Sequence, residues 1–304
     1  MLKKLPVLIA ALTLPFIAQA KTYILPPPGD SLIGNVSYDY IKPGEDIKKL
    51  ARENDIGYYE ILQANPHINP EKTYGWQQFT IPGAYLLPDT PKTGIVVNIA
   101  ELRLYYYPDR TNKVVTYPIA IGMYGMETPT GNFHIIERMD HPKWYVPQSE
   151  LKEMAKQGIY LPKVMPSNPE NPLGYYGLRL SKRTYLFHGT NVPPTVGRRA
   201  SAGCMHMYPE NIKALFDSVE VGTPVTIVDQ PFKAAWVGET LYFQAVTPLY
   251  EDRKAWGGNY VPIYKKAIAD AVAQTDAKVD IDWDRVRQML VEPDGIPQPI
   301  GHVV

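Results

Sequence analysis

"YLFHGTNVPPTVGRRASAGCMHMYP", residues 185–209, contains Cys204, the single cysteine of a chain of 304 residues, and two of its six histidines. The aromatic and apolar residues before His188 predict a strand that ends at this histidine. Pro209 is a favourable first residue for a helix, and the apolar spacing after it predicts that helix. The segment therefore predicts a strand, a loop that carries the thiol, and a helix.

The residues around the thiol have the composition of a nucleophilic site. A cysteine nucleophile needs a base within hydrogen-bond distance and donors that hold the oxyanion. His188 is the expected base, and the N–H groups of Gly203 and Cys204 are the expected donors. Arg198 and Arg199 lie within six residues of the thiol and are expected to lower its pKa and to hold an anionic substrate group. A buried, inert thiol is the alternative, and the combination of groups favours the nucleophile.

The first twenty residues, "MLKKLPVLIAALTLPFIAQA", combine two lysines, a short apolar run and an Ala-Gln-Ala ending. This order predicts a signal peptide over residues 1–20, cleaved before Lys21, and export to the periplasm. A membrane anchor is the alternative. It is disfavoured because the run is shorter than the roughly 20 residues that span a bilayer, and because two prolines interrupt it.

Composition excludes some classes of partner. Lysine plus arginine and aspartate plus glutamate both total 31, so the net charge is zero. A neutral chain has no long-range attraction for nucleic acid or for an anionic membrane surface. Thirty prolines and 22 tyrosines predict a loop-rich, β-containing protein, and the length predicts more than one folding unit.

Residues 36–83 predict a small βααβ domain. A short strand is followed by a turn at Pro43-Gly44, two helices, and a last strand through residues 79–81. The segments "PGEDIKKLA" (43–51) and "ILQANPHINP" (61–70) resemble a LysM domain, which implies binding to the N-acetylglucosamine strands of peptidoglycan. A structural spacer that binds nothing is the alternative. Residues 84–93 are expected to form a linker.

Residues 94–229 predict a central domain of mainly β structure. Aromatic and β-branched runs cover residues 94–108, 113–122, 128–139, 184–189 and 223–228, and the helix that begins at Pro209 lies between the last two expected strands. This pattern predicts an antiparallel sandwich with some α structure. Residues 232–304 predict a small α/β extension, with one strand and helices near 261–272 and 282–290.

The motifs "HGT" (188–190) and "SAGC" (201–204) resemble the signature of the L,D-transpeptidase family, a His-Gly pair followed after a loop by Ser/Thr-His-Gly-Cys. The resemblance extends to "NIAELRLYYYP" (98–108), "TPTGNFHI" (128–135), "HPKWYVP" (141–147) and "NPENPLGYYGLRL" (168–180). Two positions differ from the family pattern. The histidine before Gly-Cys is Ala202 here, and the arginine two residues after the cysteine is His206.

The resemblance implies a cysteine acyltransferase that acts on peptidoglycan and is blocked by carbapenems. Cys204 would attack meso-diaminopimelate in a stem tetrapeptide, with His188 as base and a thioester intermediate. An amine would then take the acyl group, either from a second stem peptide, giving a 3-3 crosslink, or from a lysine of an envelope lipoprotein or outer-membrane protein. No metal or cofactor is implied. The alternatives are a peptidoglycan-binding protein that lost catalysis with Ala202, and a carboxypeptidase that uses water.

The resemblance also assigns the surrounding residues. Arg199, Arg198 and His206 would hold substrate carboxylates, and Ser201 and Gly189 would shape the loop. Because histidine titrates near neutral pH, His206 is expected to hold carboxylates less well above about pH 6.5.

The Pro-rich segment 140–173 is expected to form a lid with one short helix near 149–156. Trp144 in this segment either stacks on the substrate or packs the lid onto the sandwich.

Overall fold

The computed structural model describes residues 20–304 except residues 72 and 74. The predicted signal peptide lies outside the described residues, apart from Ala20. In that described range no helix combines the length and the apolar character needed to cross a bilayer.

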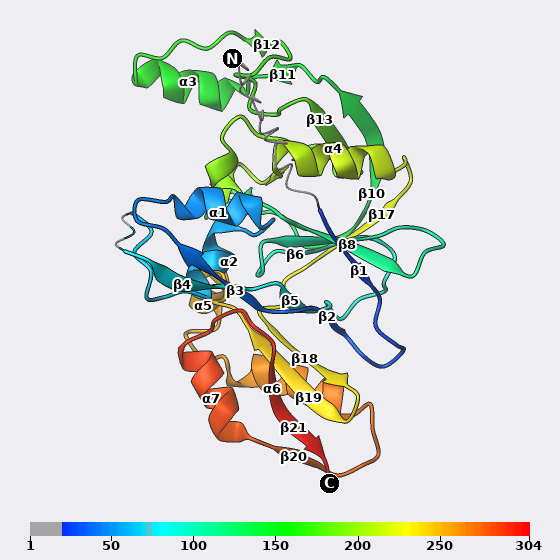
Figure 1. The fold of residues 1–304 in the computed structure, drawn as a ribbon. Helices are drawn as coiled ribbons and strands as arrows, with labels where there is room; N and C mark the ends of the chain where they lie inside the picture. Colours follow the sequence, from blue (N-terminus) through cyan, green and yellow to red (C-terminus); the bar gives the residue numbers. More distant parts are fainter. Residues whose placement is uncertain (1–19, 72, 74) are drawn as a thin grey trace, which may run out of the picture.

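A nine-stranded sheet forms the centre of the molecule (Figure 1). Its strand order is β1-β8-β7-β6-β17-β10-β13-β14-β16. The bounds are β1 (Lys21–Ile24), β8 (Lys113–Pro118), β7 (Arg103–Tyr107), β6 (Gly94–Asn98), β17 (Pro224–Val228), β10 (Gly131–Asp140), β13 (Tyr176–Leu180), β14 (Leu186–His188) and β16 (Met205–His206). Two pairs, β17 with β6 and β14 with β16, are parallel. The expectation of a purely antiparallel domain was therefore wrong, because sequence runs do not show which strands become neighbours.

The long strand β10 joins two halves of this sheet. Its first residues, 131–134, pair with β17, and the residues from Ile135 onward pair with β13, with a register shift after Ile135. Apolar side chains from both halves meet in one core, to which α4 (Pro209–Ser218) adds Ile212 and Leu215. The domain is thus mainly β with some helix, as expected. Two short strands, β9 (Ile121–Gly122) and β15 (Arg199–Ser201), pair beside it, and the 3-10 helix η1 spans Pro193–Thr195.

The N-terminal module has the order β3 (Ser37–Ile41), α1 (Ile47–Glu53), α2 (Tyr58–Gln63) and β4 (Gln77–Ile81). The side chain of Asp46 caps α1 by accepting a hydrogen bond from the Lys48 N–H at 2.9 Å. The two helices and the β3–β4 pair enclose an apolar core of their own.

This module packs tightly on the central domain. The N–H groups of Tyr58 and Tyr59, at the start of α2, donate to the carbonyls of Val196 and Gly197 at 3.2 and 3.1 Å. A Cβ added to Gly197 would lie 2.1 Å from the Tyr58 nitrogen, and Gly197 has a φ of +77°. Only glycine allows this approach. The loop between His188 and Cys204 is therefore held by the helix of another module.

Charged pairs reinforce the contact. Arg52 donates two hydrogen bonds of 2.8 Å to Glu210 at the start of α4. Arg103 of β7, only 1% exposed, pairs with Glu60 of α2 at 2.6 Å. Burying two such charges is tolerable only because they face each other and are hydrogen-bonded.

Residues 84–93 do not form a free linker. Strand β5 (Ala84–Leu86) pairs with β2 (Leu32–Gly34), and Tyr85 and Leu87 are buried with Ile33 and Tyr105. The expectation failed for the first half of this segment because its apolar side chains fill the space beside the central sheet.

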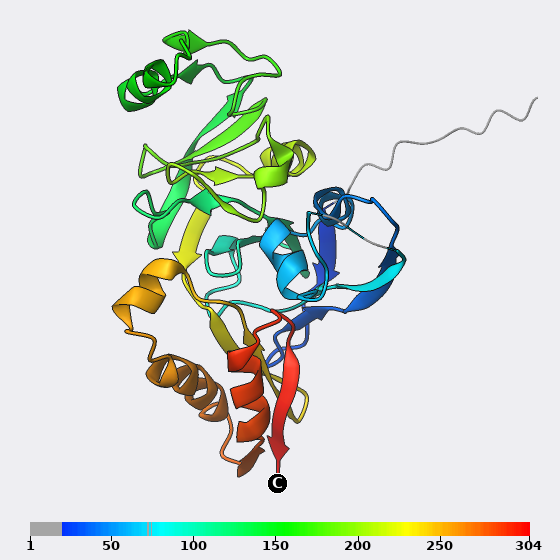
Figure 2. The same cartoon turned by 90° about the vertical axis from the view of Figure 1, so that its left-hand side faces the viewer.

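The C-terminal extension is a four-stranded sheet with helices. The sheet order is β18 (Phe232–Val237), β19 (Thr240–Ala245), β21 (Gln298–Val303) and β20 (Val279–Ile281). Helices α6 (Val261–Val272) and α7 (Trp283–Val291) pack beside this sheet (Figure 2), and α5 (Tyr250–Ala255) links it to the central domain. The segment between β10 and β13 carries β11 (Trp144–Tyr145), α3 (Gln148–Lys156) and β12 (Val164–Met165), at the end of the molecule opposite the C-terminal extension (Figure 1).

Gly197→Ala should destabilise the protein by about 3 kcal/mol, because left-handed strain costs about 1–2 kcal/mol and the added methyl group also forces α2 away. Gly222→Ala is the matched control: its φ is +96°, but an added Cβ meets nothing within 4 Å. Gly222→Ala should therefore lower the free energy of unfolding only by the cost of the backbone strain, about 1–2 kcal/mol. Urea unfolding measures both, and equal losses would show that the Gly197 contact is unimportant.

Candidate active site

Strand pairing brings the thiol loop beside two histidines. Phe187 of β14 lies opposite Met205 of β16, and His188 lies opposite His206. Phe187 and Met205 point into the apolar core. Because side chains alternate along a strand, His188 and His206 project from the other face, and Cys204, one residue before β16, is expected on that face too. The two imidazole rings lie 4.5 Å apart.

The thiol is partly buried and free. Cys204 Sγ donates a long hydrogen bond to the Thr184 carbonyl, at 3.7 Å. Burial raises the pKa of this thiol, while the backbone at Leu186 and the positive charge of Arg179 act in the opposite direction. The thiol is therefore uncharged at neutral pH.

His188 is also uncharged in its ordinary state. Its side chain is buried, and Nδ1 donates to the Gly189 carbonyl at 2.7 Å. Burial and the adjacent His206 hold the pKa of His188 well below its usual range, against the effect of the Gly189 and Pro172 carbonyls. Within the described residues no hydrogen bond joins this ring to the thiol. Catalytic hydrogen bonds are often long without substrate and tighten when it binds.

The loop around the thiol is fixed by two hydroxyl groups. The Ser201 hydroxyl donates to the Cys204 carbonyl at 2.5 Å and accepts from the Gly203 N–H at 3.1 Å. The Thr128 hydroxyl donates to the Gly203 carbonyl at 2.8 Å and accepts from the Gly122 N–H at 2.9 Å. Gly203 has a φ of +106°, so a side chain is disfavoured there.

These bonds decide which donor is free. The Gly203 N–H, expected to face the oxyanion, is used by Ser201 instead. The Cys204 N–H has no hydrogen-bond partner in the part of the chain that the structure describes. It belongs to the same planar peptide unit as the Gly203 carbonyl and points the opposite way. Thr128 therefore sets the direction of this N–H. Thr128 lies in the quoted "TPTGNFHI" segment, but only the fold brings it to the loop.

The two arginines near Cys204 in sequence do not lie at the thiol. The Arg198 guanidinium lies 3.5 Å from the centre of the Tyr58 ring in α2. Arg199 donates to the Gly122 carbonyl at 2.9 Å and pairs with Glu251 of α5. Their predicted role beside the sulfur is contradicted, because the intervening loop turns both side chains toward the neighbouring modules. Arg179 of β13, which no sequence argument singled out, supplies the positive charge.

His206 does not have the predicted charge. Burial lowers its pKa to about 4, so the ring is neutral at pH 7. The expectation that it titrates near neutral pH and holds carboxylates as a cation was therefore wrong, because β16 places the ring against His188 and away from water.

The remaining predicted residues lie around this centre. A Cβ on Gly189 would be 3.3 Å from the Leu173 carbonyl and 3.4 Å from Ile212, so glycine lets the end of the 140–173 segment approach α4 here. Trp144 lies in β11, where it pairs with Met165 of β12. The buried Asn171 ties the two ends of this segment together by donating to the carbonyls of Pro142 and Pro166 at 3.0 and 3.1 Å.

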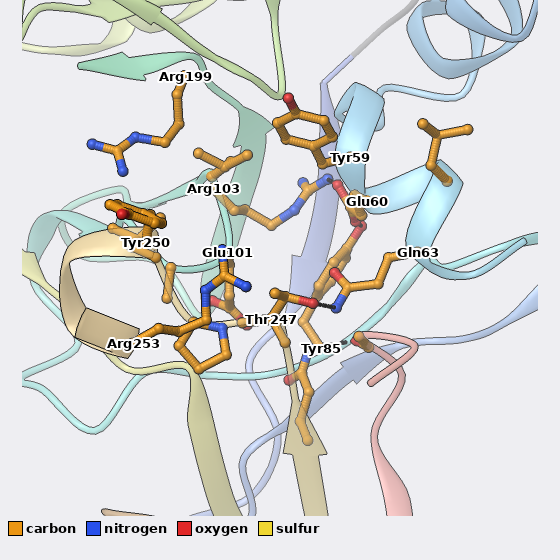
Figure 3. Close-up of a pocket in the computed structure, with 18 residues that line it drawn as sticks. Tyr59, Glu60, Gln63, Tyr85, Glu101, Arg103, Arg199, Thr247, Tyr250 and Arg253 are labelled. Atoms are coloured by element: carbon orange, nitrogen blue, oxygen red, sulfur yellow. Dashed lines mark hydrogen bonds and ion pairs between the residues drawn. The ribbon is translucent and has the colours of Figure 1, made fainter. Parts of the chain in front are cut away.

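One cavity lies away from the thiol, and Cys204 is not among the residues that line it. It has a volume of about 490 Å³ and lies between α2, the β6–β7 turn and α5, with Arg199 on its wall (Figure 3). No cluster of three or more metal-ligating side chains occurs in residues 20–304 without 72 and 74.

Comparison with known proteins identifies relatives of the chain. Residues 92–227 match the YkuD family model, the L,D-transpeptidase catalytic domain. The chain is 40% identical over 232 residues to the probable L,D-transpeptidase YcfS of Escherichia coli (strain K12), covering 74% of this chain and 72% of that protein. It is 35% identical to ErfK/SrfK of Salmonella typhimurium (93% and 92% covered) and 34% identical to YbiS of Escherichia coli (strain K12; 92% of both), also named as probable L,D-transpeptidases.

Arg179→Gln should raise the pKa of the Cys204 thiol further, because the neutral amide no longer stabilises the thiolate. Alkylation by iodoacetamide at pH 8 should therefore become severalfold slower, and its pH profile should move to higher pH. Arg199→Gln, which removes a charge nearer in sequence, should leave the profile unchanged. The reverse pattern would show that Arg199 acts on the sulfur.

Proposed function

This chain belongs to the L,D-transpeptidase family, whose activity on peptidoglycan it shares, and we propose that it transfers the acyl group through a Cys204 thioester. The observation that carries the proposal is the fixed loop, in which the Cys204 N–H lies beside its own thiol and has no partner among the described residues. The hydrogen bond from Thr128 to the Gly203 carbonyl sets the direction of this N–H. A free, preoriented N–H next to the nucleophile is what an oxyanion requires.

The first step is proposed as acylation by a stem tetrapeptide. Cys204 Sγ attacks the carbonyl carbon of meso-diaminopimelate, the amide C–N bond breaks, and D-alanine leaves with the proton that His188 took from the thiol. The shifted pKa values support a neutral pair before attack. Because His188 keeps a pKa well below its usual range, it stays able to accept a proton throughout the neutral range.

The second step is proposed as transfer of the acyl group to an amine. The acceptor is the side chain of another diaminopimelate, giving a 3-3 crosslink, or a lysine of an envelope protein. The Ala202 position does not argue for a lost activity. Its side chain is exposed, and the hydrogen bonds that hold the loop come from Ser201, Gly203 and Thr128.

The N-terminal module is proposed to bind the glycan strands as a LysM domain, and the protein is proposed to act in the periplasm after removal of residues 1–20. The βααβ order with its own core supports the first point. Trp76 lies in the loop before β4 and is 66% exposed, with the Lys42 ammonium 6.0 Å from the centre of its ring. A sugar ring can stack on such an exposed indole.

Incubation with a disaccharide tetrapeptide should release D-alanine and give a product whose mass identifies the acceptor. Cys204→Ala should abolish release. His188→Gln should reduce it at least about 100-fold, the usual contribution of a general base. Release at the wild-type rate by Cys204→Ala would refute the thioester, and disaccharide tripeptide as the sole acyl product would indicate hydrolysis.

Thr128→Val should slow acylation by about tenfold or more, because the isosteric side chain cannot hold the Gly203 carbonyl and the Cys204 N–H loses its direction. Complete removal of an oxyanion donor costs about 10²–10³. Thr128→Ser keeps the hydroxyl and should restore most of the rate. Mass spectrometry of the acyl-enzyme over time measures it. If valine and serine variants acylate equally fast, the hydroxyl has no such role.

A further inference from the structure

The cavity of about 490 Å³ is built by three modules and is separate from the thiol. Tyr59 and Gln63 of α2 form one wall, and Tyr250 and Arg253 of α5 form another (Figure 3). Gln63 donates to the Thr247 hydroxyl across the cavity at 3.1 Å. A concave volume of this size, with aromatic faces and a few polar groups, is typical of a small-ligand site.

The charged side chains that line the cavity differ in whether they have a partner of opposite charge. Glu60 is bound by Arg103 and by the Tyr85 hydroxyl, and Glu101 is bound by Lys233 and by Asn98. Both carboxylates are therefore already satisfied.

Arg199 is paired with Glu251, whereas Arg253 has no carboxylate partner in the described part of the chain. The neighbouring Asp252 faces Asp229; burial and this second carboxyl raise the pKa of Asp229 to about 8. Among the described residues that line the cavity, the single charge without an opposite partner is thus a guanidinium.

We propose that this cavity binds a carboxylate-bearing muropeptide, a sugar–peptide fragment of the wall, at a site distinct from the thiol. The inference rests on the proposed function in taking its ligand from peptidoglycan. Arg253 would hold a free stem-peptide carboxylate in a charge-assisted hydrogen bond. Tyr59, about half exposed, offers a ring face to the sugar, and Gln63 and Thr247 offer hydrogen bonds. The Tyr250 ring lies beneath the Arg253 guanidinium, 5.9 Å from the ring centre.

The test uses the whole wild-type protein and a disaccharide tripeptide, which lacks the D-alanine that the donor reaction releases. Hydrogen–deuterium exchange should slow in residues 59–63 and 247–253 when the probe is added. Calorimetry should show that Arg253→Gln raises Kd about tenfold, about 1.4 kcal/mol. Arg287→Gln, which removes an exposed charge from α7, should not change Kd.

A disaccharide tripeptide whose carboxylates are converted to amides should bind as weakly to the wild type as the acid form binds to Arg253→Gln. Equal affinity of both probes, or protection confined to the thiol loop, would overturn the proposal. Release of D-alanine from tetrapeptide is measured on the same preparations. Its persistence in Arg253→Gln separates this site from the proposed catalysis.

A second inference comes from the start of β1. The backbone nitrogen of Lys21 donates to Asp55 Oδ2 at 3.4 Å. Asp55 is 2% exposed, and its other oxygen accepts from Asn211 of α4 at 2.6 Å. Lys21 is also the first residue after the Ala-Gln-Ala pattern.

This inference rests on the proposed removal of residues 1–20: we infer that cleavage before Lys21 turns this amide into an ammonium group that pairs with the buried Asp55 carboxylate and stabilises the cleaved chain. In the uncut chain the Lys21 N–H is a neutral donor to the buried Asp55 carboxylate, and cleavage would place a positive charge at this nitrogen. Through Asn211 the pair is connected to α4, the helix that follows the thiol loop.

Chains that begin at Lys21 are compared with chains that carry a Met-Ala extension before it. The free energy of unfolding at pH 7 should be higher for the chain that begins at Lys21 than for the extended chain. Asp55→Asn should remove most of this difference, since a neutral amide cannot form an ion pair with the ammonium group. An equal stability of the two chains, or a difference that persists in Asp55→Asn, would overturn the inference. Neither result depends on catalytic turnover.

Discussion

The start of α2 lies on the loop between His188 and Cys204, and the positions of both groups depend on that contact. Two N–H groups of α2 hold the carbonyls of Val196 and Gly197, and the absence of a side chain at Gly197 lets the backbones touch. The loop is thereby anchored in its middle as well as at its two strands, β14 and β16. A module that is proposed to bind the wall thus also supports the loop that carries the proposed nucleophile.

The second support comes from inside the central domain. Ser201 and Thr128 use hydroxyl groups to fix the two peptide units around Gly203, which leaves the Cys204 N–H without a partner in the described part of the chain. Positive side chains affect the thiol less than the arginines near it in the sequence suggest. Arg198 and Arg199 connect modules, and the backbone at Leu186 together with the positive charge of Arg179 opposes the effect of burial on the pKa of the thiol. The centre is therefore organised by backbone direction more than by electrostatic attraction.

Much of the architecture was predictable because it follows from local patterns. The βααβ order, the helix from Pro209 and most strands agree with the apolar spacing, turn residues and caps. The parallel pairing of β14 with β16 was not predictable, since it depends on residues that meet only after folding. The same applies to residues 84–87, where apolar side chains expected in a linker are buried by β2.

The chain by itself determined the chemical groups and the family: one thiol, a histidine before a glycine, and a set of motifs spread over the central domain. Tertiary structure decided what each group does. In the folded chain the Gly203 N–H donates to Ser201, and Arg198 and Arg199 contact other modules. Burial keeps His206 neutral. The fold also places Thr128 and Arg179 near the thiol. The physical reason is that burial, hydrogen-bond partners and nearby charge are properties of position in space, and spacing along a chain specifies them only where the contact is local.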